Sequence, residues 1–248
     1  MPNWLDDRRR AASAPGRRRR WVAWLAFAAV LVGIAHWPTT TRYGINYRQY
    51  TRELPLYEKT ANFISRDIQT RSLLAEIVQG ASGETESLRR IFAWTVRNIR
   101  PVPDGFPVID DHVWNIIVRG YGAEDQRTEV FAILASYACC PAGAVRLTPE
   151  PMTEVVVAVV MLEGQPRVFD VANALMFQNP TGNFTTVDEL LRDPDLVASV
   201  SRGLAPHGVP YSRYTAMLGE LQPVYARMES QKPWQRFRRE IARVVGGG

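Results

Sequence analysis

The stretch GYGAEDQRTEVFAILASYA, residues 120–138, joins a glycine-rich turn directly to a helical pattern. Its apolar residues recur at the spacing of one helical face, and they are Val130, Phe131, Leu134, Ala135 and Ala138. A helix with one apolar stripe packs that stripe against a core. The sequence therefore predicts a helix from about Glu124 to Ala138, buried on one side and preceded by a turn.

The pattern changes beyond this helix. Residues 144–148, 154–163 and 167–171 are runs rich in β-branched residues, which favour strands. Gly164-Gln165 separates the last two runs and predicts a hairpin. Because helices come first and antiparallel strands follow, the predicted fold class is α+β.

Two further helices are predicted upstream of the turn. One spans about residues 53–79, and the other begins near Glu84 and stops before Pro101. Residues 38–52 are polar and aperiodic, and they are interpreted as a connector. Residues 185–245 are mostly helical in pattern, with several breaks at prolines.

The composition is that of an ordinary globular protein. The 248 residues are 46% hydrophobic and include two Cys, which excludes a disordered chain and a disulfide framework. Lys and Arg together number 30 against 25 Asp and Glu, and the excess positive charge lies in the first twenty residues. Because the rest of the chain is balanced, we expect no binding to nucleic acid.

An uncharged apolar run, WVAWLAFAAVLVGIAHW at residues 21–37, follows four consecutive arginines. We expect a transmembrane helix here, with tryptophans as interfacial anchors and the basic side in the cytoplasm. The protein would then be a single-pass protein of the bacterial inner membrane, with that membrane as a partner and a periplasmic body. A signal peptide cleaved after Ala35, twin-arginine export and a buried helix are the alternative interpretations.

Four segments, in order, are similar to the transglutaminase-like superfamily, which has a papain-like α+β fold. They are residues 88–100 (LRRIFAWTVRNIR), 120–126 (GYGAEDQ), 141–145 (PAGAV) and 155–170. In that family the second segment carries a nucleophilic cysteine at the start of a helix, and the last is a hairpin with a histidine and an aspartate. The resemblance covers about residues 84–172 and implies helices packed on a small antiparallel sheet.

The catalytic positions implied by the resemblance are degenerate. The cysteine position falls on Glu124 and the histidine position on Val155, and the aspartate alone is retained, as Asp170. Acyl transfer by this family needs a nucleophile and a base, so we expect the thiol chemistry to be lost. Cys139 and Cys140 lie about 20 Å away at the far end of the helix. We interpret them as two small buried residues, with an intermolecular disulfide as the alternative.

The former active-site cleft is the expected binding site. Its candidate residues are Trp114, Tyr121, Glu124, Asp125, Gln126 and Asp170. Glu124 and Asp125 also have a purely structural interpretation, because carboxylates at a helix N-terminus gain about 0.3 to 1 kcal/mol from the helix dipole. Glu124 with Asp170 would alternatively make a pair of carboxylates able to act as acid and base.

No metal site and no cofactor are expected. His112 follows two aspartates, whose adjacent side chains diverge rather than converge on one ion, and this trio is assigned a structural role. His36 is interpreted as an interfacial residue and His207 as a loop residue. The basic amphipathic segment 234–245 is interpreted as a surface helix, with binding to anionic lipid as the alternative.

The expected organisation is a cytoplasmic tail (1–20), a transmembrane helix (21–37), a connector and helix (38–83), a transglutaminase-like core (84–184) and a helical extension (185–248). The expected function is binding without catalysis, with a partner protein or polysaccharide as ligand. The resemblance implies cell-envelope or exopolysaccharide assembly as the context. The alternatives are a hydrolase or transferase that uses Glu124 and Asp170 on an envelope glycan or peptide, and an adaptor acting through its anchor and C-terminal helix.

Overall fold

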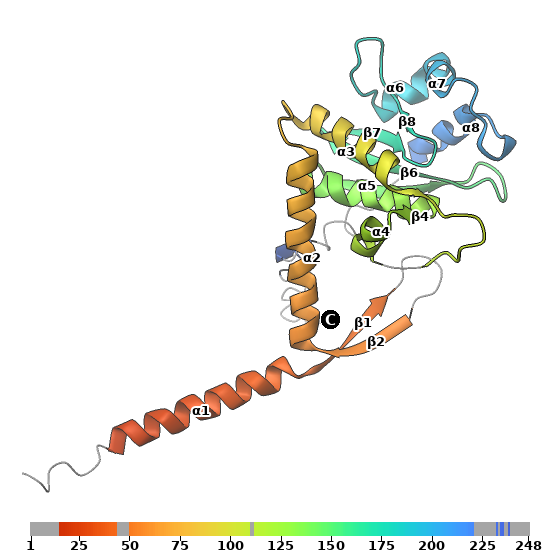
Figure 1. The fold of residues 1–248 in the computed structure, drawn as a ribbon. Helices are drawn as coiled ribbons and strands as arrows, with labels where there is room; N and C mark the ends of the chain where they lie inside the picture. Colours follow the sequence, from red (N-terminus) through yellow and green to blue (C-terminus); the bar gives the residue numbers. More distant parts are fainter. Residues whose placement is uncertain are drawn as a thin grey trace, which may run out of the picture. The chain divides into compact units, whose positions relative to one another are not determined.

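The fold is α+β, as the strand and helix patterns predict (Figure 1). The computed structural model describes residues 15–43, 50–109 and 112–220, together with residues 232, 234, 235 and 238. Contacts within the chain divide it into two units. The smaller unit comprises residues 1–42 and 51–62, and the larger comprises residues 43–50 and 63–248.

The smaller unit contains two strands where the sequence predicts an aperiodic connector. Helix α1 (Pro15–Ala35) is followed by β1 (Pro38–Tyr43) and β2 (Tyr50–Pro55), which form a two-stranded sheet, and then by the start of α2 (Leu56–Ile77). The Thr39 hydroxyl donates to the Leu54 carbonyl at 2.8 Å, and Lys59 Nζ donates to the Thr40 carbonyl at 2.8 Å. Threonine favours strands, but polar strands lack the apolar alternation that would predict them.

The predicted membrane anchor is wrong. Among the residues with described positions, no helix is both long enough and apolar enough to cross a bilayer. Helix α1 begins at Pro15 and so contains the four arginines at 17–20. The apolar part that follows, residues 21–35, is roughly 22 Å long at the helical rise, whereas the hydrocarbon layer is about 30 Å thick. The transmembrane helix over residues 21–37 and the single-pass inner-membrane location are therefore corrected.

The larger unit contains the helices that position the site. Helix α3 spans Glu84–Asn98 and α5 spans Glu124–Ala138, in agreement with the sequence. Between them lie α4 (Val113–Arg119), which the sequence analysis did not assign, and the short parallel strands β3 (Arg100–Pro101) and β4 (Tyr121–Gly122). Helix α5 is buried along most of its length, more than its one-sided apolar pattern predicts.

The main sheet has four antiparallel strands in the order β5-β6-β7-β8. Their bounds are Ala142–Leu147, Val155–Leu162, Gln165–Asp170 and Leu175–Met176. The predicted hairpin between β6 and β7 is present, but its turn lies at Glu163-Gly164, one residue earlier than predicted. Both turn residues have positive φ, 53° and 74°, as the two-residue turns that match the twist of a hairpin require.

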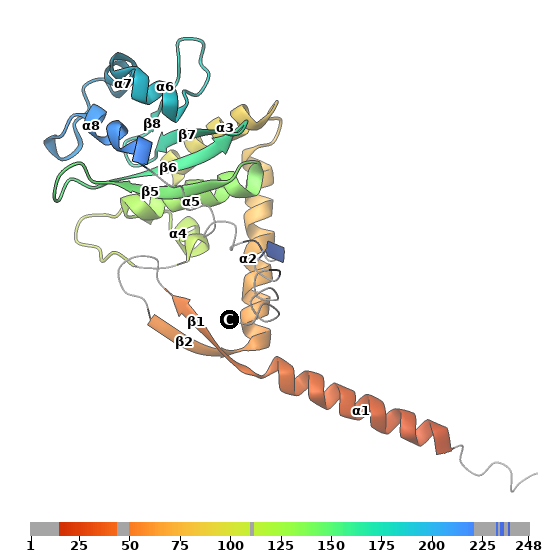
Figure 2. The same ribbon diagram turned by 180° about the vertical axis from the view of Figure 1, so that it is seen from behind.

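Each face of this sheet packs against its own set of helices. Ala158, Val160 and Phe169 pack with α3 and α5 in one core, whereas Val155 and Val157 pack on the opposite face with the C-terminal helices. Those helices are α6 (Val187–Arg192), α7 (Pro194–Ser201) and α8 (Tyr211–Ala216), with 3-10 turns at Pro206–Gly208 and Met217–Glu220. Figures 1 and 2 show them on the side of the sheet away from α5. Residues 221–231 and most of 233–248, including most of the predicted C-terminal helix, lie outside the described residues.

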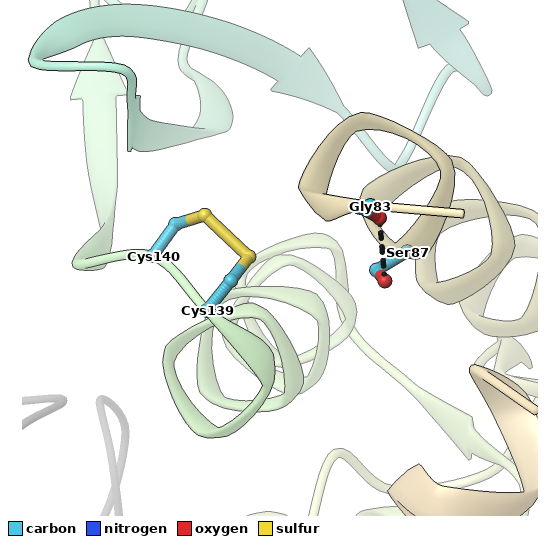
Figure 3. The surroundings of a disulfide bond; sticks show 4 residues. All are labelled: Gly83, Ser87, Cys139 and Cys140. Carbon is cyan, nitrogen blue, oxygen red and sulfur yellow. Dashed lines mark hydrogen bonds between the residues drawn. A yellow bond between two sulfur atoms is a disulfide. The ribbon is translucent and has the colours of Figure 1, made fainter. Parts of the chain in front are cut away.

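The two cysteines form a disulfide with each other. Cys139 is the residue that ends α5 and Cys140 begins the path to β5, with 3.7 Å between their Cα atoms (Figure 3). The same figure shows Ser87 on α3, whose hydroxyl donates to the Gly83 carbonyl at 2.8 Å. The interpretation of the cysteines as two separate small residues is therefore wrong.

Candidate functional site

The start of α5 depends on a close approach between backbone and side chain. A Cβ on Gly122 would lie 3.1 Å from side-chain atoms of Gln126 and of Ile116, so this position leaves little room for any other residue. Gln126 caps the start of the helix, because its Oε1 accepts the Ala123 backbone N–H at 3.1 Å. Its Nε2 donates to the Ile109 carbonyl at 2.8 Å. Gln126 is thus a buried structural residue.

An open groove of about 380 Å³ lies beside the start of α5. Its lining comes from β3 and the loop after it, from β4 and the start of α5, from β6 and the residue before it, and from the segment after β7. The lining residues are Pro101, Val102, Val108, Gly122, Ala123, Glu124, Asp125, Arg127, Glu154, Val156 and Ala172. The groove therefore lies at the helix start where the resemblance places a nucleophile.

Glu124 is the first residue of α5. Much of its surface is exposed to solvent, but the carboxyl group itself is partly desolvated. This burial, and next the negative charge of Asp170, raises the pKa of Glu124. His207 and Arg127 act in the opposite direction and so lie within electrostatic range of it. No hydrogen bond or ion pair to the Glu124 carboxylate is found within the described part of the chain.

Arg146 forms ion pairs with both Asp125 and Glu154. Arg146 Nη2 lies 3.3 Å from Asp125 Oδ2, and Arg146 Nη1 donates to Glu154 Oε1. Asp125 is buried, and its Oδ1 also accepts the Gln126 backbone N–H at 2.8 Å. Both carboxylates therefore serve to build the wall of the groove, and Glu124 differs from them in lacking a partner.

Arg127 fixes two other walls. Its guanidinium is buried and donates to three backbone carbonyls, those of Ile99 at 3.0 Å, Ala172 at 3.3 Å and Val171 at 3.3 Å. Burial lowers the pKa of Arg127, and Glu124 and Asp170 oppose that shift. One side chain thus ties the loop after α3 to the segment after β7, on either side of the groove.

Asp170 is fully buried and committed to hydrogen bonds. Its Oδ2 accepts from the Tyr211 hydroxyl at 2.7 Å and from Asn173 Nδ2 at 2.8 Å, and its Oδ1 accepts the Asn173 backbone N–H at 2.9 Å. Burial, followed by Asp170, raises the pKa of Tyr211 well above its ordinary value. Asp170 is absent from the groove lining, so it affects Glu124 through its charge, and the two carboxylates do not both face the groove.

The remaining candidate residues lie elsewhere. Val155, at the histidine position, is 1% exposed and faces the core shared with α6 to α8. Trp114 lines a separate cavity of about 20 Å³. Tyr121 packs under the Arg119 guanidinium, with 4.9 Å from Cζ to the ring centroid. His112 caps α4 by accepting the Trp114 backbone N–H at 3.1 Å, a structural role, while Asp110 and Asp111 lie outside the described residues.

His207 lies next to a residue of the groove, a contact that the sequence analysis did not predict. Its Nε2 lies 3.0 Å from the carbonyl oxygen of Glu154, a residue that lines the groove. The segment Ala205-Pro206-His207-Gly208 signals a turn, but nothing in the sequence indicates what the turn contacts. No group of three or more His, Cys, Asp or Glu suited to a metal ion occurs among the residues described.

The comparisons with known proteins give a faint structural match. No protein-family model and no curated protein matches this chain. A matching solved structure is described as a "putative protease" from Parabacteroides distasonis ATCC 8503, with a TM-score of 0.35 and 10% sequence identity. The match covers 55% of this chain and 36% of that one, so the chain spans about a third of its length.

The raised pKa of Glu124 makes a prediction about stability. The ordinary pKa of a glutamate is 4.5, and the pKa of Glu124 in the folded protein is higher. The folded protein therefore becomes less stable as the pH rises through the folded pKa and the carboxyl loses its proton. Glu124→Gln removes that loss. We expect this variant to unfold at a higher urea concentration than the wild type at pH 7, with the difference vanishing below about pH 4. A variant less stable than the wild type at pH 7 would show instead that the carboxylate stabilises α5 through its dipole.

Proposed function

We propose that this chain is a degenerate transglutaminase-like protein that binds a partner protein or a polysaccharide in the groove beside the start of α5, without catalysis. The observation that carries the proposal is an open groove at the former nucleophile position that contains an unpaired carboxylate and no thiol. Cell-envelope or exopolysaccharide assembly, the context that the resemblance implies, is part of the proposal.

The triad positions support binding over thiol catalysis. Glu124 replaces the cysteine, Val155 is buried away from the groove, and Asp170 has its oxygens occupied by Tyr211 and Asn173. By contrast, the walls are held by arginine contacts that fix their shape. A preformed groove with a few polar groups is the usual form of a binding site.

The experiment places a photoreactive phenylalanine derivative in the groove of the full chain, in cells that make the protein. Val108, which lines the groove and is 41% exposed, is the test position. Val118, which is 70% exposed on α4 and does not line the groove, is the control. We expect a discrete adduct from Val108 and none from Val118. Equal adducts from both positions, or none from Val108, would remove the groove from the account.

A second candidate function is hydrolysis with Glu124 as a general acid. Partial burial and Asp170 raise the pKa of Glu124, which is the shift that general acids need near neutral pH. This candidate requires the purified chain to cleave an envelope glycan or peptide, and Glu124→Gln to abolish the cleavage. Equal rates for the wild type and Glu124→Gln would exclude it.

A further inference from the structure

The segment of residues 206–214 is joined to the structure around the groove by hydrogen bonds from two of its side chains, and a third bond lies within the segment. His207 Nε2 lies 3.0 Å from the Glu154 carbonyl oxygen, and the Tyr211 hydroxyl donates to Asp170 at 2.7 Å. The Tyr214 hydroxyl donates to the Pro206 carbonyl at 2.9 Å and so holds the loop to α8. Glu154 lines the groove and His207 does not, so these bonds hold the imidazole of His207 next to the backbone of a lining residue.

The backbone at His207 is left-handed, with φ 52° and ψ 23°. Such a conformation costs a residue other than glycine about 1 kcal/mol and persists where the surroundings fix it. His207 is exposed and belongs to neither apolar core, so packing does not account for its position. The segment thus holds an exposed imidazole in one place.

The hydrogen bond to Glu154 determines which ring nitrogen can meet a ligand. When Nε2 carries the proton and donates to the carbonyl, Nδ1 is left as an acceptor. The Glu124 carboxylate, which lies within electrostatic range of His207, is also an acceptor. Two acceptors at one end of a groove suit a ligand that presents N–H or O–H donors.

The lining of the groove favours a protein segment over a sugar chain. Its apolar part is aliphatic, from residues such as Val102, Val108 and Val156, and no aromatic ring contributes to the lining that the structure describes. The short two-stranded sheet of β3 and β4 also borders the groove. Aliphatic pockets beside a sheet edge suit an extended peptide. The unpaired carboxylate of Glu124 disfavours acidic side chains of that peptide near it.

We propose that His207 is a ligand-binding residue of the groove, and that the ligand is an extended protein segment without acidic side chains at this point. The inference rests on the proposed function and adds the class of ligand and a residue that recognises it. The resemblance places the family's histidine at Val155. In the structure the imidazole of His207 contacts the carbonyl of Glu154, the residue just before Val155. The C-terminal extension is then part of the site.

The test repeats the crosslinking from Val108 in the full chain with His207→Asn. Asparagine tolerates left-handed backbone well, so the loop is expected to keep its path, and thermal unfolding checks this. Losing the ring contact is expected to lower the yield of the adduct about 5- to 10-fold. The control is Arg202→Asn, which replaces another exposed left-handed residue, with φ 50°, at the end of α7. Arg202 does not line the groove, and the change should leave the yield unchanged.

Digestion of the adduct identifies the class of ligand. The proposal expects the proteinase digest to contain the peptide with position 108 joined to a second peptide from another protein. The same peptide joined instead to a sugar chain that glycosidases remove would overturn the inference and leave the groove proposal intact. A yield unchanged by His207→Asn would do the same, whereas absence of any adduct from Val108 would overturn both.

Discussion

Arg127→Met is expected to lower the free energy of unfolding by about 2 to 4 kcal/mol. The change leaves three carbonyls without their donor, those of Ile99, Val171 and Ala172, and the bonds to Ile99 and Val171 are buried. Part of this loss of stability is offset, because the methionine side chain carries no charge and so avoids the cost of burying a charged guanidinium. Urea unfolding at pH 7 measures the difference.

Arg127→Lys serves as the control for charge. Lysine keeps the positive charge but cannot bond three separate carbonyls in the fork geometry of a guanidinium, so we expect a loss smaller than that of methionine but still measurable. If Arg127→Met costs under 1 kcal/mol, then Arg127 does not hold the two walls together. In that case the shape of the groove would have to depend on the aliphatic packing of its lining.

Asp170→Ala is expected to destabilise the protein by a similar amount, about 2 to 4 kcal/mol. The Tyr211 hydroxyl and the Asn173 backbone N–H lose their acceptor while they remain buried or partly buried. For this reason Asp170 is a poor choice for testing ligand binding, since its loss disturbs the C-terminal segment as well as the groove.

A double-mutant cycle isolates the contact between Asp170 and Tyr211. Tyr211→Phe removes the hydroxyl and keeps the ring, and it is expected to cost about 1 kcal/mol alone. In the Asp170→Ala background the same change should cost little, because the hydroxyl has already lost its partner. Additive effects of the two changes would show that the bond contributes nothing to stability.

The parts of the fold that the sequence predicts well are those with local signals. Helix α5 begins at Glu124 and ends at Ala138 as expected, since the glycine turn and the acidic first turn mark its start. The sequence predicts the hairpin turn one residue too late, because Gly164 is the second residue of the turn and Glu163, the first, is also left-handed. Composition alone does not reveal that a glutamate takes that conformation.

The sequence predictions that were wrong or incomplete concern features that depend on the surroundings of a residue in the fold. The apolar run 21–37 predicts a membrane span, but its helix includes the arginines and ends before His36. The sequence favours two separate cysteines at 139 and 140, because a disulfide between neighbouring residues needs a strained ring, whereas the structure joins them. The sequence indicates a loop at His207 and cannot show its contact with Glu154, which lies more than fifty residues earlier in the chain.

The candidate site was predicted in part for the same reason. Glu124 and Asp125 were named from a local motif, and both line the groove. Gln126 came from the same motif but is buried as the residue that closes the helix start. Arg127 and Arg146, which build the walls, carry no motif, and their roles appear when distant segments are brought together.

The most direct test of the account compares the adduct yield from Val108 in the wild type, in Glu124→Ala and in Asp195→Ala. Asp195 is the matched control, because it is an exposed carboxylate in the first turn of another helix, α7, outside the groove. If the groove binds its ligand through the unpaired carboxylate, Glu124→Ala will lower the yield about tenfold and Asp195→Ala will leave it at the wild-type level. The same yield in all three proteins would contradict the claim that Glu124 marks a binding site.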